Sequence, residues 1–111
     1  MLEPGLDEHE WISRWEALEE DLRDSPAEAL VEADDLVASM MEARRFPLEE
    51  REGEDATEPE TVRQFVEARR VMRVVESGDA FDPGDVASAV DGYRSLYDYL
   101  LNIGPSSGAP A

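Results

Sequence analysis

His9 is the only histidine in the chain, and it is the first residue to consider for chemistry because imidazole can act as a general base or a metal ligand. The chain contains no cysteine, and a transition-metal site usually takes more than one imidazole or thiolate. We therefore expect His9 to be a solvated surface residue, with a pH-sensitive contact or a metal ligand as the alternatives. No catalytic, cofactor-binding or metal-binding residue is expected in this chain.

Three aspartates around a glycine-containing turn, Asp79, Asp82 and Asp85, form the second cluster to consider. A calcium-binding EF-hand loop places its acidic ligands two residues apart and ends with a glutamate at the twelfth position. Here the spacing is three residues, so the motif does not match. The cluster is typical of a helix cap flanked by solvated acids.

Four charged residues beside the apolar stripes of the sequence are expected to form structural ion pairs. They are Asp34, Arg69, Arg73 and Arg94. A buried carboxylate can do acid–base work when its pKa is separated from that of a partner. Because a bidentate contact with an arginine fixes the register of two helices, we favour a structural role for Asp34 and Arg94. Ligand binding is the alternative.

Aromatic side chains are numerous for a chain of this length, and five of them are candidate contacts with a partner protein. These are Trp11, Trp15, Phe46, Phe81 and Tyr99. Tryptophans one helical turn apart are more often core residues, but any aromatic surface left exposed would be a favourable binding hot spot. Tyr99 falls off the main apolar stripe of its segment and is the best candidate for an exposed aromatic.

Apolar residues recur with helical spacing in four segments, which are residues 7–24, 26–45, 59–77 and 83–102. Short signatures mark their ends: two capping boxes, an aspartate cap before proline, and a glycine at a C-terminus. These signatures are Ser25 with Glu28, Thr57 with Glu60, Asp82, and Gly78. No stretch alternates as a strand would.

The fold class predicted from these segments is all-α. Since the apolar faces of four helices must cover one another, we expect a small four-helix bundle made of two helical hairpins joined by a charged linker, residues 48–58. One domain, residues 1–103, accommodates the bundle, and residues 104–111 are expected to form a disordered tail.

The charge of the chain is strongly negative and uneven. The 111 residues carry a formal net charge of −18, and all ten basic residues are arginine. Residues 1–55 contain 19 acids and five arginines, whereas residues 56–111 contain nine acids and five arginines. This balance argues against broad binding to nucleic-acid phosphates. It fits complementary helix packing, an acidic surface for a basic partner, or salt adaptation.

Three local patterns resemble an uncharacterised group of small, acidic, all-helical bacterial proteins, mainly actinobacterial. The patterns are DSPAEALVEADDLV at residues 24–37, RFP at residues 45–47, and YRSLYDYLL at residues 93–101. The group has a D-x-P-x-x-A-V-x-E-A-D-x-L-V helix and a terminal Y-R-x-hydrophobic-F-x-x-L-L helix. Tyr97 replaces the usual phenylalanine. The resemblance implies a helical fold and carries over no activity.

The function expected from the sequence is a non-enzymatic helical protein-interaction module, with a homodimer as one form of it. The alternative is an acidic mimic of nucleic acid, or an inhibitor of a basic partner protein. The first eight residues have no basic n-region and no apolar h-region, and no stretch of 18 apolar residues occurs. A cytoplasmic protein without membrane contact is therefore expected.

Overall fold

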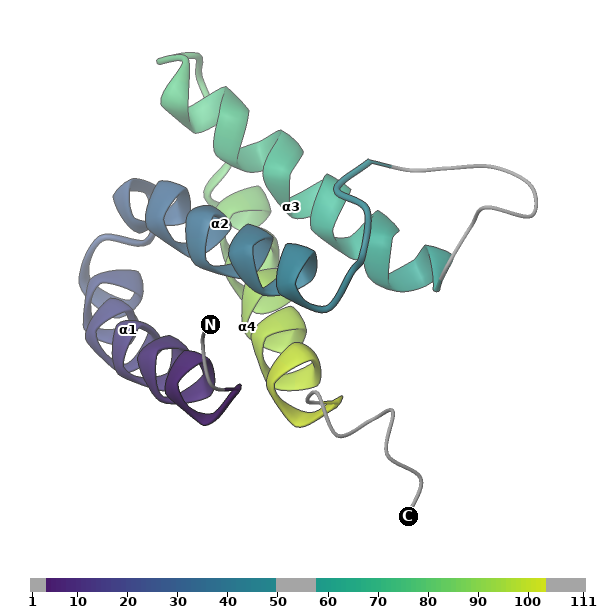
Figure 1. Ribbon diagram of the computed structural model, residues 1–111. Helices are drawn as coiled ribbons and strands as arrows, with labels where there is room; N and C mark the ends of the chain where they lie inside the picture. The colour runs from purple at the N-terminus through teal and green to yellow at the C-terminus, as the bar shows by residue number, and fades with distance from the viewer. Residues whose placement is uncertain (1–3, 50–57, 104–111) are drawn as a thin grey trace.

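The computed structural model describes residues 4–49 and 58–103, and these residues form four α-helices without a strand (Figure 1). The helices are α1 (Pro4–Asp24), α2 (Pro26–Ala43), α3 (Pro59–Glu76) and α4 (Pro83–Ile103). The prediction of an all-α four-helix bundle is confirmed. Most of the predicted linker, the Thr57 cap and the predicted tail at residues 104–111 lie outside the described residues.

Helix α2 stops at Ala43, two residues before the predicted end at Arg45, because Arg45 takes a left-handed conformation with φ 69°. The Arg45 N–H donates to the carbonyl oxygen of Glu42 over 3.0 Å, and the Phe46 N–H donates to that of Met41 over 2.8 Å. This pair of bonds is a Schellman motif, in which the residue after the left-handed one packs back onto the helix. Phe46 is accordingly buried.

The N-caps of α2 and α3 differ from those expected. Ser25 stands at the N-cap of α2, but its side chain makes no capping hydrogen bond. Ser25 is the single residue between α1 and α2, and its backbone serves both helices: its N–H donates to Asp21 and its carbonyl accepts from Ala29. The N-cap of α3 is Glu58 rather than Thr57, and Glu58 takes a left-handed φ of 46°.

The predicted boundary between α3 and α4 is confirmed at both of its ends. Gly78 follows α3 with φ 86°, a value that a glycine adopts without the steric cost of a side chain. The Asp82 carboxylate accepts a hydrogen bond from the Gly84 N–H over 2.8 Å, which satisfies one free donor of the first turn of α4.

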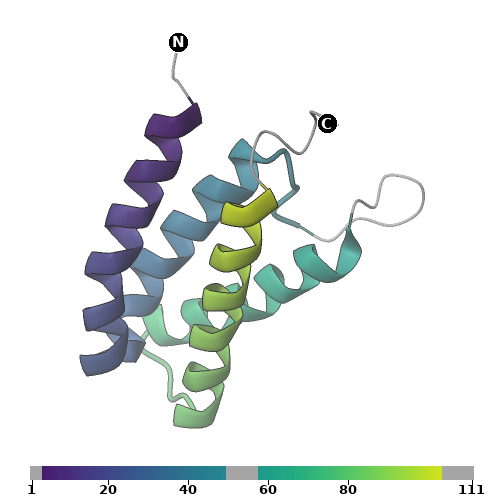
Figure 2. The same ribbon diagram turned by 90° about the horizontal axis from the view of Figure 1, so that it is seen from below.

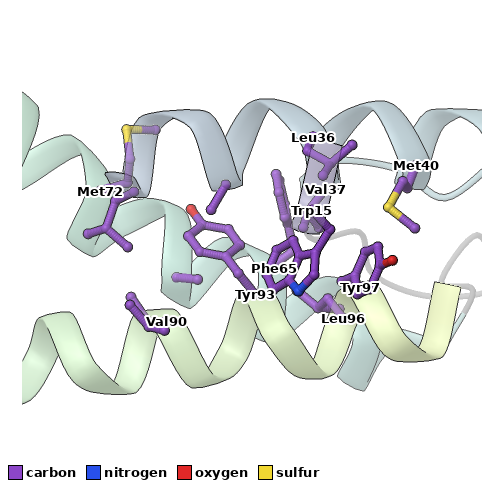
Figure 3. Close-up of a cluster of buried hydrophobic side chains, with 14 of the residues drawn as sticks. Trp15, Leu36, Val37, Met40, Phe65, Met72, Val90, Tyr93, Leu96 and Tyr97 are labelled. Atoms are coloured by element: carbon purple, nitrogen blue, oxygen red, sulfur yellow. The ribbon is translucent and has the colours of Figure 1, made fainter. Parts of the chain in front are cut away.

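Helix α2 is central, because it packs against each of the other three helices. Figure 2 shows α1 and α2 side by side and antiparallel, with α3 crossing obliquely. Two side-chain contacts join α1 to α4. Trp15 stacks on Tyr97 with ring centroids 4.5 Å apart (Figure 3), and Arg94 forms an ion pair with Glu19. None of the helices, as far as the structure describes them, combines the length and apolarity needed to cross a membrane.

Gly92 is a buried helical residue of α4 where α3 packs closely. A β-carbon there would meet the Ala68 β-carbon at 3.7 Å and the Gln64 γ-carbon at 3.8 Å, which are ordinary contact distances. We expect Gly92→Ala to raise the free energy of unfolding by about 0.5–1 kcal/mol, because alanine restricts the unfolded chain. Urea denaturation measures this change.

The matched control is Gly78→Ala, at the left-handed position after α3. There the same substitution should lower the free energy of unfolding by about 1 kcal/mol, because a side chain is strained at positive φ. A Gly92→Ala protein that is less stable than the parent would show that the α3–α4 contact tolerates no added methyl group.

Candidate functional site

A cluster of three polar side chains, two buried and one partly buried, joins α2, α3 and α4, and it is the first place to look for chemistry. Asp34 of α2 is only 2% exposed. Arg69 of α3 donates to it through two nitrogens, Nη2 to Oδ1 over 2.8 Å and Nε to Oδ2 over 3.1 Å. The Tyr93 hydroxyl of α4 donates to Oδ2 over 2.7 Å. Figure 3 shows this hydroxyl directed toward α2.

The surroundings of the cluster favour a structural role. Burial and the hydrogen bond to Asp34 raise the pKa of Tyr93, and the bond to Asp34 also raises the pKa of Arg69. The Arg69 guanidinium lies over the Phe65 ring, 4.6 Å from its centroid. In the described part of the chain, every buried side-chain nitrogen and oxygen has a partner. The three groups are therefore engaged with one another.

Arg94 makes the bidentate contact with a carboxylate that its position favoured. Its Nη2 and Nε donate to the two carboxylate oxygens of Glu19 over 3.1 and 3.2 Å. The hydrogen bond from Arg94 lowers the pKa of Glu19, and Glu19 also accepts from the Trp15 indole over 2.8 Å. Arg73, by contrast, forms no ion pair with an acid in the described part of the chain.

Three of the five candidate aromatic contacts are buried and offer no surface to a partner. Trp11, Trp15 and Phe46 belong to the core, so the prediction that they contact a partner is not supported by their placement. The Arg44 guanidinium covers Trp11 at 4.9 Å from the ring centroid. Their burial follows from the helical spacing of the tryptophans and from the Schellman motif at Phe46.

The other two candidate aromatics, Phe81 and Tyr99, are exposed. Phe81, in the loop between α3 and α4, is 44% exposed, and Tyr99 is 38% exposed. The Tyr99 hydroxyl donates to the carboxylate of Glu58, which raises the pKa of Tyr99. Tyr99 is therefore held by its own chain, whereas Phe81 has no polar group to satisfy and its ring is open to a partner.

Phe81 borders a groove of about 510 Å³ where the α1–α2 turn meets the first turns of α4. Figure 2 shows these segments at the same end of the molecule. We call this feature the Phe81 groove. Its apolar lining residues are Leu22, Pro26, Ala27, Phe81, Pro83, Val86, Ala87 and Val90. Eight of the eleven described lining residues are thus apolar, and both helical hairpins contribute to them.

The charges that line the Phe81 groove are all negative. Glu28 lies on the α2 side and Asp91 on the α4 side, and no basic residue in the described part of the chain lines the groove. Asp91 approaches Arg94 at 3.5 Å, but both groups are largely exposed, and Arg94 already holds Glu19. Such an exposed pair is weak, so both carboxylates keep an appreciable negative field over the groove.

Two other hollows are less suited to a single class of ligand. One, of about 950 Å³ between α3 and α4, mixes Arg63 with acids of both helices. The other, of about 620 Å³, carries Arg69, Arg70 and Arg73 of α3. Arg69 and Arg70 are already paired with Asp34 and Glu67. These hollows lack the uniform charge and the mostly apolar lining of the Phe81 groove.

Metal chemistry finds no support in the described residues. No three histidine, aspartate or glutamate side chains within residues 4–49 and 58–103 are grouped to hold an ion. Within the acidic turn, Asp82 caps α4 and Asp79 accepts from the Ser77 hydroxyl over 3.0 Å. His9 is exposed on α1.

Sequence reasoning named Phe81 but missed the rest of its groove. Pro26 and Ala27 lie at the start of the predicted helical segment 26–45, and Val86 and Val90 lie within the predicted segment 83–102, so neither pair was expected at a binding surface. The available signal was a bulky aromatic isolated among small and acidic residues, in a loop where no helical stripe demands burial. Comparisons of the chain with protein-family models, with curated proteins and with solved structures gave no match.

Proposed function

We propose that this chain is a non-enzymatic helical protein-interaction module and that it binds its partner through the Phe81 groove. The observation that carries the proposal is the 44% exposure of Phe81 beside a groove whose described lining is mostly apolar. Leaving aromatic surface in water is unfavourable, and burying a whole phenylalanine side chain is worth about 1.5–3 kcal/mol. A rigid exposed aromatic at an apolar groove is typical of a binding hot spot.

The bonding of the buried ionisable groups supports the non-enzymatic part of the proposal. Asp34, Arg69 and Tyr93 would be the natural acid–base candidates, but all three are held by mutual hydrogen bonds. A general acid or base must reach a proton of the substrate. Their arrangement instead holds α2, α3 and α4 in register.

The net charge favours a different protein over a second copy of the chain as the partner. Two copies would each bring a formal charge of −18 to the contact, and like charges oppose association most strongly at low salt. A homodimer through the Phe81 groove is therefore the less favoured form of the proposal, and the experiment below distinguishes it.

The proposal is tested by placing a photoreactive phenylalanine analogue at position 81 and irradiating the protein in a lysate of its source cells. We expect a discrete protein adduct, identified by mass spectrometry. The matched control carries the same analogue at position 12, where Ile12 is similarly exposed on α1. An adduct of twice the chain's own mass would indicate a homodimer. Identical adducts at both positions, or none at position 81, would count against the groove as the docking site.

A further inference from the structure

We infer that the Phe81 groove binds a cationic amphipathic helix of its partner, which inserts apolar side chains beside Phe81 and directs lysine or arginine side chains toward Glu28 and Asp91. This inference rests on the proposed function and adds the chemistry of the partner. It is carried by the placement of two carboxylates, one on the α2 side and one on the α4 side of an apolar groove that no basic residue among those described lines.

The field over the groove is negative beyond its two lining carboxylates. Four further acids and one base are exposed and adjacent in sequence to lining residues: the acids Asp21, Asp24, Asp82 and Asp85, and the base Arg23. The whole chain adds a net charge of −18. An anionic ligand would be repelled here, whereas a cationic one gains both association rate and orientation from the field.

The shape of the groove favours a helix over a single inserted side chain. Its walls are the first turn of α2 and the first two turns of α4, with Phe81 at one edge. An amphipathic helix buries apolar residues spaced three and four apart in such an apolar groove. Ala87, exposed on the α4 wall, has a small side chain that allows close approach of another backbone.

The charge pattern is tested with three designed peptides of about 14 residues, which is four turns of helix. The first has leucines spaced as one helical face and lysines flanking them. The second keeps the lysines and replaces each leucine with alanine. The third keeps the leucines and replaces each lysine with glutamate. Each is titrated into isotope-labelled protein while the backbone amide resonances are followed.

We expect the first peptide to shift the amides of Ala27, Phe81 and Ala87 in a saturable manner. The second and third peptides should bind at least about tenfold more weakly, because one lacks the apolar anchor and the other meets like charge. Raising the salt concentration should weaken the first peptide by screening the carboxylates.

Variants separate the groove from the general acidity of the surface. The double substitution E28Q/D91N should weaken the first peptide by about threefold or more, because two facing charges are lost. The matched control E16Q/D98N removes the same charge from exposed residues near Tyr97 and should change affinity far less. Phe81→Ser should weaken binding by about tenfold or more while the protein stays folded.

Three results would overturn the inference. If the alanine peptide binds as tightly as the first, the contact is general electrostatic attraction. If the glutamate peptide binds as tightly at the same amides, the groove docks apolar helices and the cationic chemistry is wrong, while the proposed function stands. If no peptide shifts the groove amides, the inference fails, and the adduct at position 81 then decides separately whether the groove docks any partner.

Discussion

Replacing Arg69 with methionine is expected to lower the free energy of unfolding by about 3 kcal/mol, because it leaves a buried carboxylate without its cation. Asp34 is 2% exposed, and its carboxylate accepts hydrogen bonds from two nitrogens of Arg69. Tyr93 would remain as a donor, but one neutral hydroxyl does not compensate a full charge. Urea denaturation at neutral pH measures the loss.

The neighbouring arginine supplies the control. Arg70 pairs with Glu67 on the same helix, and both side chains are more than half exposed. Arg70→Met should therefore change the free energy of unfolding by less than about 0.5 kcal/mol. The double variant D34N/R69M should be more stable than Arg69→Met alone, because no uncompensated charge remains. Equal small effects of both single substitutions would mean that water, rather than Arg69, solvates Asp34.

The fold was predictable because its signals are local. Apolar residues spaced for one helical face predict a helix wherever a neighbour covers that face. The end signals are also local, because Asp82 caps the helix that begins one residue later and Gly78 follows the helix that ends two residues earlier. Two of the errors arose where the backbone takes a left-handed conformation. Arg45 and Glu58 both take positive φ, which neither residue type favours, so the end of α2 and the cap of α3 were misplaced.

The side-chain pairings were only partly predictable. Asp34 beside an apolar stripe requires a partner, since a buried charge is otherwise very unfavourable. Which arginine pairs with Asp34 depends on how α3 crosses α2, and the sequence spacing of Arg69 and Arg73 does not determine that crossing. The Phe81 groove depends on the same nonlocal geometry, because α2 and α4 supply its two walls.

At alkaline pH the free energy of unfolding is expected to fall steeply above about pH 10, the ordinary pKa of tyrosine. The pKa is raised for Tyr93 by burial and by Asp34, for Tyr97 by burial and nearby acids, and for Tyr99 by Glu58. The unfolded chain then releases protons that the folded chain retains, so stability decreases as pH rises. For Tyr93 alone the loss is about 1.4 kcal/mol per pH unit, or about 2.7 kcal/mol by pH 12.

The composition of the chain allows a loss of stability at alkaline pH to be assigned to its tyrosines. The chain has no lysine and no cysteine, and the α-amino group titrates near pH 8, so only tyrosines change charge between about pH 9 and 12. In Tyr93→Phe, unfolding releases one proton fewer, so the free energy of unfolding should fall with pH less steeply, by about 1.4 kcal/mol per pH unit. Near-ultraviolet absorbance should show Tyr93 ionising only as the protein unfolds. Equal slopes for Tyr93→Phe and the parent would mean that the hydroxyl reaches solvent and that the Asp34 cluster opens at high pH.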